Sequence, residues 1–357
     1  MSSAKYIKSL DGVRAIAALL VLVFHFSQYA IFQSDWGKML QKIGYLGQTG
    51  VSLFFVLSGF LITRILFDQI HSSHYWKNFI IRRSLRIFPL YYLYLTCEYF
   101  VVPFFTHTPS PDISLQWYYW FYLQDFATTF HWPSAGPKHF WSLAVEEHFY
   151  LAWPFIVLYY KVKKIIQPII AVLIISALVR FLLAYFQYQT YFFTFARMDE
   201  IALGALLAWM EKNEKLDFFK QKTFYFILFI IGVFSVILWG LFSSEGLLIL
   251  QVIKYNLISI LYFLLIGKVI NLDQNHWISR LLCTPFFNYT GKISYGLYVY
   301  QATAVIWGIT HGYANQPLLF LASLIFFCYL IATISFYLFE QPILKLKNKF
   351  TYSSHQQ

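Results

Sequence analysis

Residues 9–32 read SLDGVRAIAALLVLVFHFSQYAIF, an apolar run long enough to cross a bilayer as a helix. Arg14 and His25 interrupt this run, and their spacing puts both on one face of the helix, about 16 Å apart along its axis. Asp11, three residues before Arg14, lies on the same face. An ionisable group at membrane depth costs at least about 2.5 kcal/mol, so this face indicates a functional site. The alternative is that Arg14 and His25 extend to opposite membrane interfaces.

The composition of the whole chain is that of a membrane protein. Its 357 residues are 59% hydrophobic and 12% charged, and this charged share is about half of that in a typical soluble domain. The first apolar run is too long for a signal peptide and lacks a cleavage site, so we expect it to remain as a helix. Cys97, Cys283 and Cys328 have neither pairing nor metal-like spacing, and we expect no metal site.

The apolar segments predict an all-α membrane protein with about ten transmembrane helices around a central cavity. The expected spans lie near residues 10–30, 46–66, 86–106, 139–160, 165–186, 196–211, 222–243, 247–268, 291–310 and 317–340. We expect residues 1–345 to form one polytopic membrane domain and residues 346–357 to form a short polar cytoplasmic tail. The helices indicate no particular oligomeric state.

The basic residues predict the orientation of these spans. If the N-terminus is inside, most of the 27 Lys and Arg residues fall on the inner side, and only Lys38, Lys42 and Lys138 fall in outer loops. Cytoplasmic loops of membrane proteins carry such an excess, so we expect both termini to be cytoplasmic. The net charge of +11 then reflects topology and attraction to anionic membrane lipids, and we expect no nucleic-acid partner.

Two polar clusters lie in the second and third expected spans. The segment from Gly50 to Phe60 contains Ser58 and small residues that allow a close approach, either of a neighbouring helix, which we favour, or of a ligand. Arg82, Arg83 and Arg86 lie at the inner mouth of the third span. Arg83 and Arg86 are one turn apart and suit phosphate groups, although the positive-inside rule alone explains one or two of these arginines.

The fourth span contains Trp141, Ser142, Glu146 and Glu147. Two carboxylates in an apolar helix require a cavity or partners. Glu147 is expected about 12 Å below the outer membrane edge and His25 about 8 Å below it, so a carboxylate–imidazole contact is possible. Glu146 points about 100° away from Glu147 and needs a different partner.

Two further features have alternative interpretations. Arg197 and Asp199, at the outer start of the sixth span, either pair within a structural salt bridge or contribute to an acceptor site. The aromatic run from Gln116 to Tyr122 lies in the only long outer loop, residues 107–138. This run forms either an interfacial aromatic belt or a stacking surface for a sugar.

In these motifs the chain resembles the integral-membrane acyltransferase-3 family, the O-acyltransferases of bacterial surface glycans and some antibiotics. Arg14 and His25 match the Arg-x10-His pair of this family, and Arg83 and Arg86 match its Arg-x-x-Arg element. The segment from Trp141 to Glu147 is similar to its Trp-Ser-Leu-x-x-Glu-Glu signature. The resemblance extends from Tyr6 to about Pro342, and it includes the segment Phe339-Glu-Gln-Pro342. One departure is Gln301, which stands where the family often has His and cannot titrate.

The resemblance implies a donor, acyl-CoA and most often acetyl-CoA, and an acceptor hydroxyl on a cell-envelope carbohydrate or lipid-linked glycan. It also implies location in the bacterial inner (plasma) membrane. Lipopolysaccharide, capsule and peptidoglycan remain open as acceptors. The alternative function is a transporter or flippase of a glycan or lipid-linked intermediate, and a third, weaker interpretation is a structural membrane subunit.

Our mechanistic hypothesis assigns roles to the polar residues of the helices. His25 is the general base on the acceptor hydroxyl, because imidazole titrates near pH 6.5, and acetyl-His25 is a possible intermediate. Glu147 orients the ring. Arg14 holds the donor or stabilises an oxyanion, and Asp11 aims Arg14. The residues expected to bind the donor are Arg82, Arg83, Arg86 and Ser58, and those given an acceptor or structural role are Glu146, Trp141, Ser142, Arg197 and Asp199.

Overall fold

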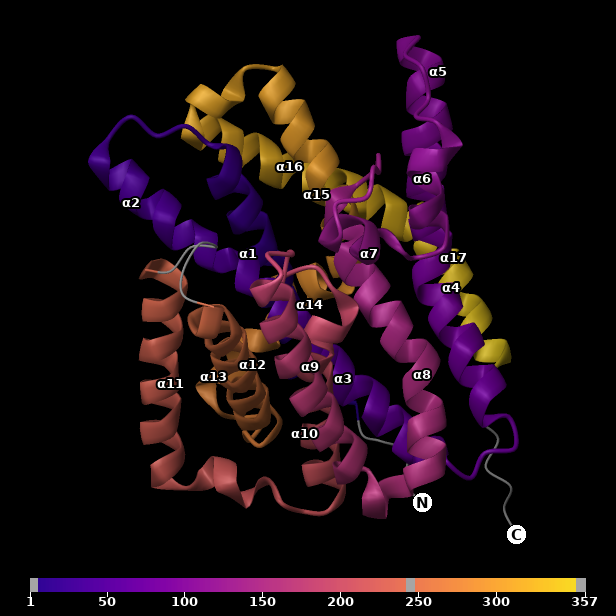
Figure 1. Cartoon of the computed structure of the whole chain (residues 1–357), viewed down its shortest axis with the longest axis vertical. Helices are drawn as coiled ribbons and strands as arrows, with labels where there is room; N and C mark the ends of the chain where they lie inside the picture. The colour runs from indigo at the N-terminus through magenta and orange to yellow at the C-terminus, as the bar shows by residue number, and fades with distance from the viewer. Residues whose placement is uncertain (1–5, 242–247, 351–357) are drawn as a thin grey trace.

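Within residues 6–241 and 248–350, the part of the chain that the computed structural model describes, all regular secondary structure is helical (Figure 1). The expected all-α class is confirmed. Each expected span contains a long helix, and these helices are α1 (Ser9–Tyr29), α3 (Gly50–Gln69), α4 (Tyr75–Thr96), α8 (Trp141–Lys164), α9 (Ile166–Tyr185), α10 (Thr194–Lys212), α11 (Lys222–Leu241), α12 (Leu248–Ile270), α15 (Ser294–Thr310) and α16 (Pro317–Ser335). The junction expected between the seventh and eighth spans falls at residues 242–247, outside the described residues.

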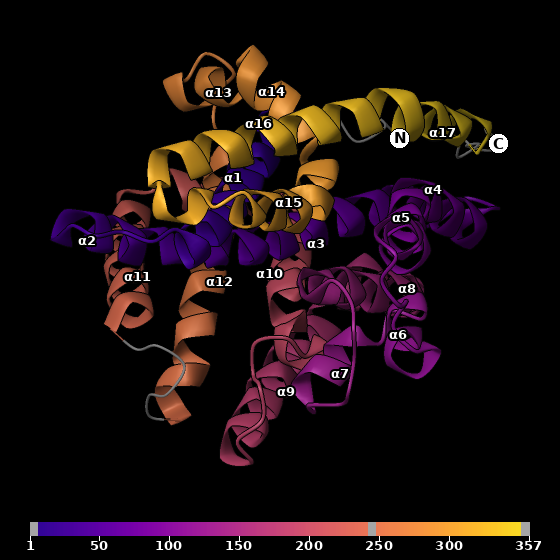
Figure 2. The same ribbon diagram turned by 90° about the horizontal axis from the view of Figure 1, so that it is seen from above.

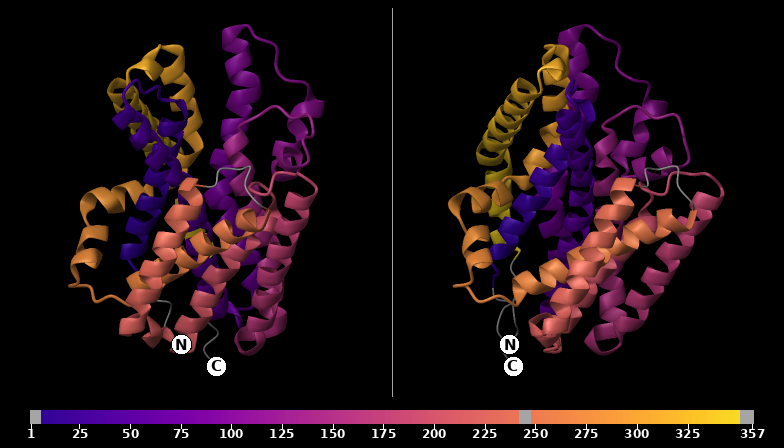
Figure 3. Two further views of the ribbon diagram at one scale, coloured as in Figure 1. Left: turned by 60° about the vertical axis from the view of Figure 1, so that its left-hand side comes forward. Right: turned by 90° about the vertical axis from the view of Figure 1, so that its left-hand side faces the viewer.

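Seven helical segments of the described chain are long and apolar enough to cross a membrane. They are Ser9–Tyr29, Asp35–Gln69, Tyr75–Thr106, Ile166–Tyr185, Lys222–Trp239, Val252–Ile270 and Pro317–Lys349. The other three long helices are more polar or shorter. Internal charged residues lie in α8 and α10, and α15 has only 17 residues. Figure 3 shows these helices from two further sides.

Helix α3 occupies the centre of the bundle and packs against α1, α4, α8, α10 and α12. Seen from above in Figure 2, α16 lies on one side of α1 and α3, and α9, α11 and α12 lie on the other. The central position follows from the sequence of α3. Its residues up to Thr63 carry no charge, and Gly50, Ser58 and Gly59 leave space for neighbouring helices.

The closest helix contact joins α3 to α10 and depends on two glycines. A Cβ atom on Gly59 would overlap the carbonyl oxygen of Ile201, and one on Gly204 would overlap the carbonyl oxygen of Val56. The two backbones therefore approach more closely than any larger side chain permits. This contact fixes α10, with its charged residues, against the central helix.

The third expected span begins earlier than predicted. We expected residues 86–106, whereas α4 begins at Tyr75 and continues through η2 (Cys97–Val101) and α5 (Val102–Thr106). Arg and Lys are good helix formers, so the basic residues near the inner mouth extend the helix and do not mark its start. The η2 segment is a π-helix next to Pro103. Ser110 donates a hydrogen bond of 2.6 Å to the Tyr99 carbonyl, which Pro103 cannot satisfy.

The long outer loop is also partly helical, with α6 (Ile113–Trp120) and α7 (Gln124–Thr129). Its aromatic run packs on α4, because Trp120 stacks on Tyr92 and Tyr122 stacks on Tyr91, with ring centroids 6.0 and 4.2 Å apart. Trp117 and Phe121 remain exposed. Trp120 and Tyr122 therefore anchor the loop on α4, whereas Trp117 and Phe121 form an exposed aromatic surface.

A buried carboxylate joins this loop to α10. The backbone N–H and the hydroxyl of Thr194 donate to Oδ2 of Asp125, at 3.2 and 2.6 Å. His148 of α8 lies beside them, with Nδ1 at 2.8 Å from the Thr194 hydroxyl. Burial raises the pKa of Asp125 to about 7. The outer loop is thus held on the same helices that position the charged residues of α8 and α10.

Replacing Gly204 with Ala should destabilise the protein by about 1–3 kcal/mol, because the added methyl forces α3 and α10 apart. Gly232→Ala is the matched control, since a Cβ atom there would meet only Leu261 Cδ1 at 3.9 Å. The measurement is the midpoint of thermal unfolding of each variant in detergent. We expect a lower midpoint for Gly204→Ala alone. Equal midpoints for both variants would contradict the close contact.

Candidate active site

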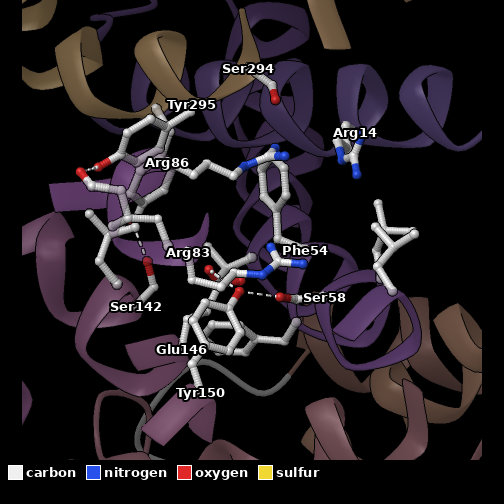
Figure 4. Close-up of a pocket in the computed structure, with 17 residues that line it drawn as sticks. Arg14, Phe54, Ser58, Arg83, Arg86, Ser142, Glu146, Tyr150, Ser294 and Tyr295 are labelled. Atoms are coloured by element: carbon white, nitrogen blue, oxygen red, sulfur yellow. Dashed lines mark hydrogen bonds between the residues drawn. The ribbon is translucent and has the colours of Figure 1, made fainter. Parts of the chain in front are cut away.

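A cavity with an empty volume of about 800 Å³, partly open to solvent, lies between α1, α3, α4, α8 and α15. Its wall is apolar on the α3 side, where Phe54, Phe55 and Leu61 contribute. The polar residues that line it come from the other helices and from Ser58. They are Arg14, Ser58, Arg83, Arg86, Ser142, Glu146, Tyr150, Ser294, Tyr295 and Tyr298 (Figure 4).

Three arginines give the cavity its charge. Figure 4 shows the guanidinium groups of Arg14, Arg83 and Arg86 directed toward the same space. Arg14 forms an ion pair with Asp11, as the sequence predicted, and the two side chains keep 19% and 17% of their surface exposed. Arg83 and Arg86 lie within electrostatic range of Arg14. Because the charges repel one another in the apo cavity, the arrangement favours an anionic ligand.

Glu146 is the carboxylate that lines this cavity. The hydroxyl of Tyr150 donates to Oε2 of Glu146 at 3.0 Å, and it also forms a hydrogen bond with the hydroxyl of Ser58. The guanidinium of Arg83 lies over the Tyr150 ring, 5.5 Å from its centroid. Ser58 therefore lines the cavity and also contacts the neighbouring helix α8. The sequence had left open whether this part of α3 packs on a helix or faces a ligand, and Ser58 does both.

Helix α15 adds three lining residues that had no predicted role. Tyr298 forms a hydrogen bond with Ser142 and donates another to the carbonyl oxygen of His139. Tyr295 donates to the carbonyl oxygen of Ile87 at 2.8 Å, and Ser294 lies at the start of the helix. These residues lie on the same helix as Gln301, the one position of this helix to which the family resemblance drew attention.

The expected contact between His25 and Glu147 is not present in the described structure, and neither residue lines the cavity. His25 lies instead within electrostatic range of His139, which directly precedes α8. The physical reason is the position of α3, which packs against both α1 and α8. A similar expected depth therefore does not make the two side chains neighbours.

Glu147 faces the aromatic residues of α4 and the outer loop. It lies within electrostatic range of Tyr92 and Tyr122 and of Arg83. Its Oε1 atom is buried and has no hydrogen-bond partner among the described residues. The 100° rotation between adjacent helix positions thus directs Glu146, and not Glu147, into the cavity.

Arg197 and Asp199 lie outside the cavity and form buried ion pairs. Arg197 contacts Glu200 at 3.1 Å, and Asp199 accepts two hydrogen bonds from Arg180 of α9, at 2.8 and 2.9 Å. Trp141 belongs to this cluster, because the Arg197 guanidinium lies 5.8 Å from its ring centroid. These contacts match the structural alternative left open by the sequence. Arg180 had no predicted role.

Arg82 points away from the cavity, toward the end of the described chain. Its Nη1 donates to the carbonyl oxygens of Lys347 and Phe350, at 3.1 and 3.2 Å. The first five residues of the expected polar tail, 346–350, thus pack on α4, and residues 351–357 lie outside the described chain. Among the described residues, no group of three or more His, Cys, Asp or Glu side chains could hold a metal ion.

The structure brings Arg14, the pair Arg83 and Arg86, and Glu146 to one cavity, and each of them belongs to one of the sequence motifs. A family model described as an acyltransferase domain matches residues 7–339. The chain belongs to this acyltransferase family. The resemblance read from the motifs is therefore confirmed across nearly all of the described helices.

Several curated relatives are similar to this chain over almost its full length. The peptidoglycan O-acetyltransferase OatA of Listeria monocytogenes is 28% identical, and the match covers 96% of this chain and 56% of that protein. The O-acetyltransferase OatA of Staphylococcus aureus is 27% identical over 97% of this chain and 58% of its own length. A putative O-acetyltransferase of Staphylococcus aureus is 28% identical over 87% and 52%. The chain thus spans about half the length of these relatives. No solved structure matches it.

The cavity predicts different chemical accessibility for the arginines. Phenylglyoxal, an arginine-specific reagent, should modify Arg86 in the detergent-purified protein, because that residue lines a space open to solvent. Arg180 and Arg197, with no exposed side-chain surface, should react only on unfolding and serve as internal controls. The measurement is the modified fraction of each peptide by mass spectrometry over time. If Arg86 is as slow as Arg197, the cavity is not open to solvent.

Proposed function

We propose that this chain is a multi-pass O-acyltransferase of the bacterial inner membrane. It transfers an acyl group, most often acetyl, from cytoplasmic acyl-CoA to a hydroxyl of a cell-envelope carbohydrate or lipid-linked glycan. The observation that carries the proposal is the convergence of Arg14, Arg83 and Arg86 on one cavity that also contains Glu146. Membership of the acyltransferase family and the printed names of the relatives, O-acetyltransferases, support the same reaction class.

The proposed topology has ten transmembrane helices in residues 1–345, with both termini and the tail at 346–357 in the cytoplasm. In this orientation α1 and α4 begin on the inner side, and α8 begins on the outer side. The cavity lining then extends from Arg14 and Arg83, in the inner halves of their helices, to Ser142 at the outer start of α8. Such a cavity suits a reaction whose donor and acceptor arrive from opposite sides of the membrane.

In the proposed complex, the donor enters from the cytoplasm. Arg83 and Arg86 hold its diphosphate, since guanidinium groups bind phosphate oxygens in a bidentate manner. The pantetheine arm then extends along the apolar wall of α3 toward Glu146 and Ser142. Arg14, aimed by Asp11, lies beside this path and holds the donor.

His25 is the proposed general base, and it acts from the outer side. It takes the proton of the acceptor hydroxyl while the hydroxyl oxygen attacks the thioester carbonyl carbon. Collapse of the tetrahedral intermediate breaks the carbon–sulfur bond, and the leaving thiolate receives the proton from the imidazolium. His139 connects this region to the cavity, because its carbonyl oxygen accepts the hydrogen bond of Tyr298. Glu146 replaces Glu147 in the proposal as the carboxylate at the acyl group.

Replacing His25 with Ala should reduce acyl transfer by at least about 100-fold, the usual contribution of a general base. The assay follows release of the CoA thiol from acetyl-CoA by purified protein in lipid nanodiscs with added envelope glycan. His311→Ala, on an exposed loop, is the matched control and should retain full activity. If the His25 variant transfers the acyl group at the wild-type rate, His25 is not the general base. Glycan movement by wild-type protein without thioester consumption would instead indicate a transporter.

Glu146→Gln and Glu147→Gln form a matched pair on adjacent positions of α8. Because only Glu146 lines the cavity and bonds to Tyr150, its replacement should lower kcat by about tenfold or more, and that of Glu147 should have a smaller effect on kcat. The same thiol-release assay at saturating acetyl-CoA measures both. A larger loss in Glu147→Gln would show that the sequence-based assignment of Glu147 was correct.

A further inference from the structure

The segment that follows α16 is held against the basic part of α4. It consists of η6 (Phe336–Glu340), α17 (Gln341–Lys345) and η7 (Leu346–Lys349), and it runs beside α4 in Figure 1. The two hydrogen bonds from Arg82 to the carbonyl oxygens of Lys347 and Phe350 fix its end. The carbonyl oxygen of Lys347 also accepts a backbone hydrogen bond of 3.0 Å from the N–H of Phe350.

This docking places Lys347 near the basic residues of α4. Its ammonium group is partly buried and experiences the charges of Arg86, Arg83 and Arg82, with Arg86 the strongest. Like charges repel more strongly when they are removed from water. The hydrogen bonds of Arg82 use only backbone oxygens. They therefore do not account for the position of the Lys347 side chain near these arginines.

Within the described residues, the nearby carboxylates form no ion pair with Arg86 or Lys347. Glu340 and Glu146 lie within electrostatic range of Arg86. In the part of the chain described, however, no carboxylate oxygen is within ion-pair distance of Arg86 or Lys347. Glu340 instead accepts a hydrogen bond of 3.2 Å from Ser335. A strongly anionic group bound between Arg86 and Lys347 would relieve the repulsion.

We infer that Lys347 and Arg86 bind a phosphomonoester, and that this group is the ribose 3′-phosphate of the acyl-CoA donor. The assignment rests on the proposed function. An acyl-CoA carries two separate anionic groups, a diphosphate next to the pantetheine arm and a 3′-phosphate beyond it. If the thioester lies deepest, near Ser142, the 3′-phosphate lies nearest the cytoplasmic mouth, where η7 covers α4. The C-terminal segment thus completes the donor site and makes it specific for a 3′-phosphorylated nucleotide.

The test compares the binding of CoA and 3′-dephospho-CoA to the full chain in nanodiscs of neutral phosphatidylcholine, by titration calorimetry. Wild-type protein should bind CoA about tenfold more tightly than 3′-dephospho-CoA, the effect of one charge-assisted contact. Lys347→Ala should lose most of this preference, with a loss of affinity for CoA alone. Lys347→Arg should retain the preference, which separates lost charge from disturbed folding. Lys349→Ala, an exposed residue of the same segment, is the matched control.

Two results would overturn the inference. One is equal affinity of wild-type protein for the two nucleotides, and the other is an unchanged preference in Lys347→Ala. If wild-type protein binds neither nucleotide, the proposed function fails as well. A parallel titration in nanodiscs with phosphatidylglycerol distinguishes the other source of phosphate. If that lipid stabilises the wild type but not Lys347→Ala, and CoA binding is unaffected by the substitution, the site binds a lipid headgroup and not the donor.

Discussion

The cost of a charge inside an apolar helix bundle is the constraint on which the rest of this structure depends. Every ionisable side chain at membrane depth must find a partner or reach water. Arg180 and Arg197 satisfy the constraint in the first way, since each is fully buried and paired with an acid. Arg14, which also pairs with Asp11, lines a cavity together with Arg83 and Arg86. The difference separates arginines that hold the bundle together from arginines available to a ligand.

The same constraint explains how much could be predicted from the sequence. The helical class and the approximate positions of most long helices follow from apolar length and charge, whereas α4 begins earlier than its apolar residues indicate. The ion pair of Asp11 with Arg14 follows from their spacing on one helix. Contacts between helices could not be predicted in this way. His25 and Glu147 have similar expected depths, yet α3 packs between their helices. Asp199 pairs with Arg180, which lies on a different helix, α9.

Two adjacent residues of α8 show most clearly what could not be predicted from the sequence. Glu146 and Glu147 differ by 100° in direction, and the sequence gives no information on which direction faces the cavity. The structure directs Glu146 toward Tyr150 and Ser58, while Glu147 faces aromatic residues of α4 and the outer loop. Lys347 is a second case. From the sequence, a basic residue in a short polar tail indicates membrane topology alone. In the structure η7 packs on α4, and Lys347 lies within electrostatic range of Arg86.

The central claim is that the arginine cavity binds the acyl donor. The most direct test is a cryo-electron microscopy map of the full chain in nanodiscs with a thioether analogue of acetyl-CoA, which cannot transfer its acyl group. The account predicts density for the diphosphate within hydrogen-bonding distance of Arg83 and Arg86, with the pantetheine arm passing Arg14 and Glu146 and the acetyl group near Ser142. Nucleotide density away from α4, or a cavity without nucleotide at a saturating concentration, would contradict it.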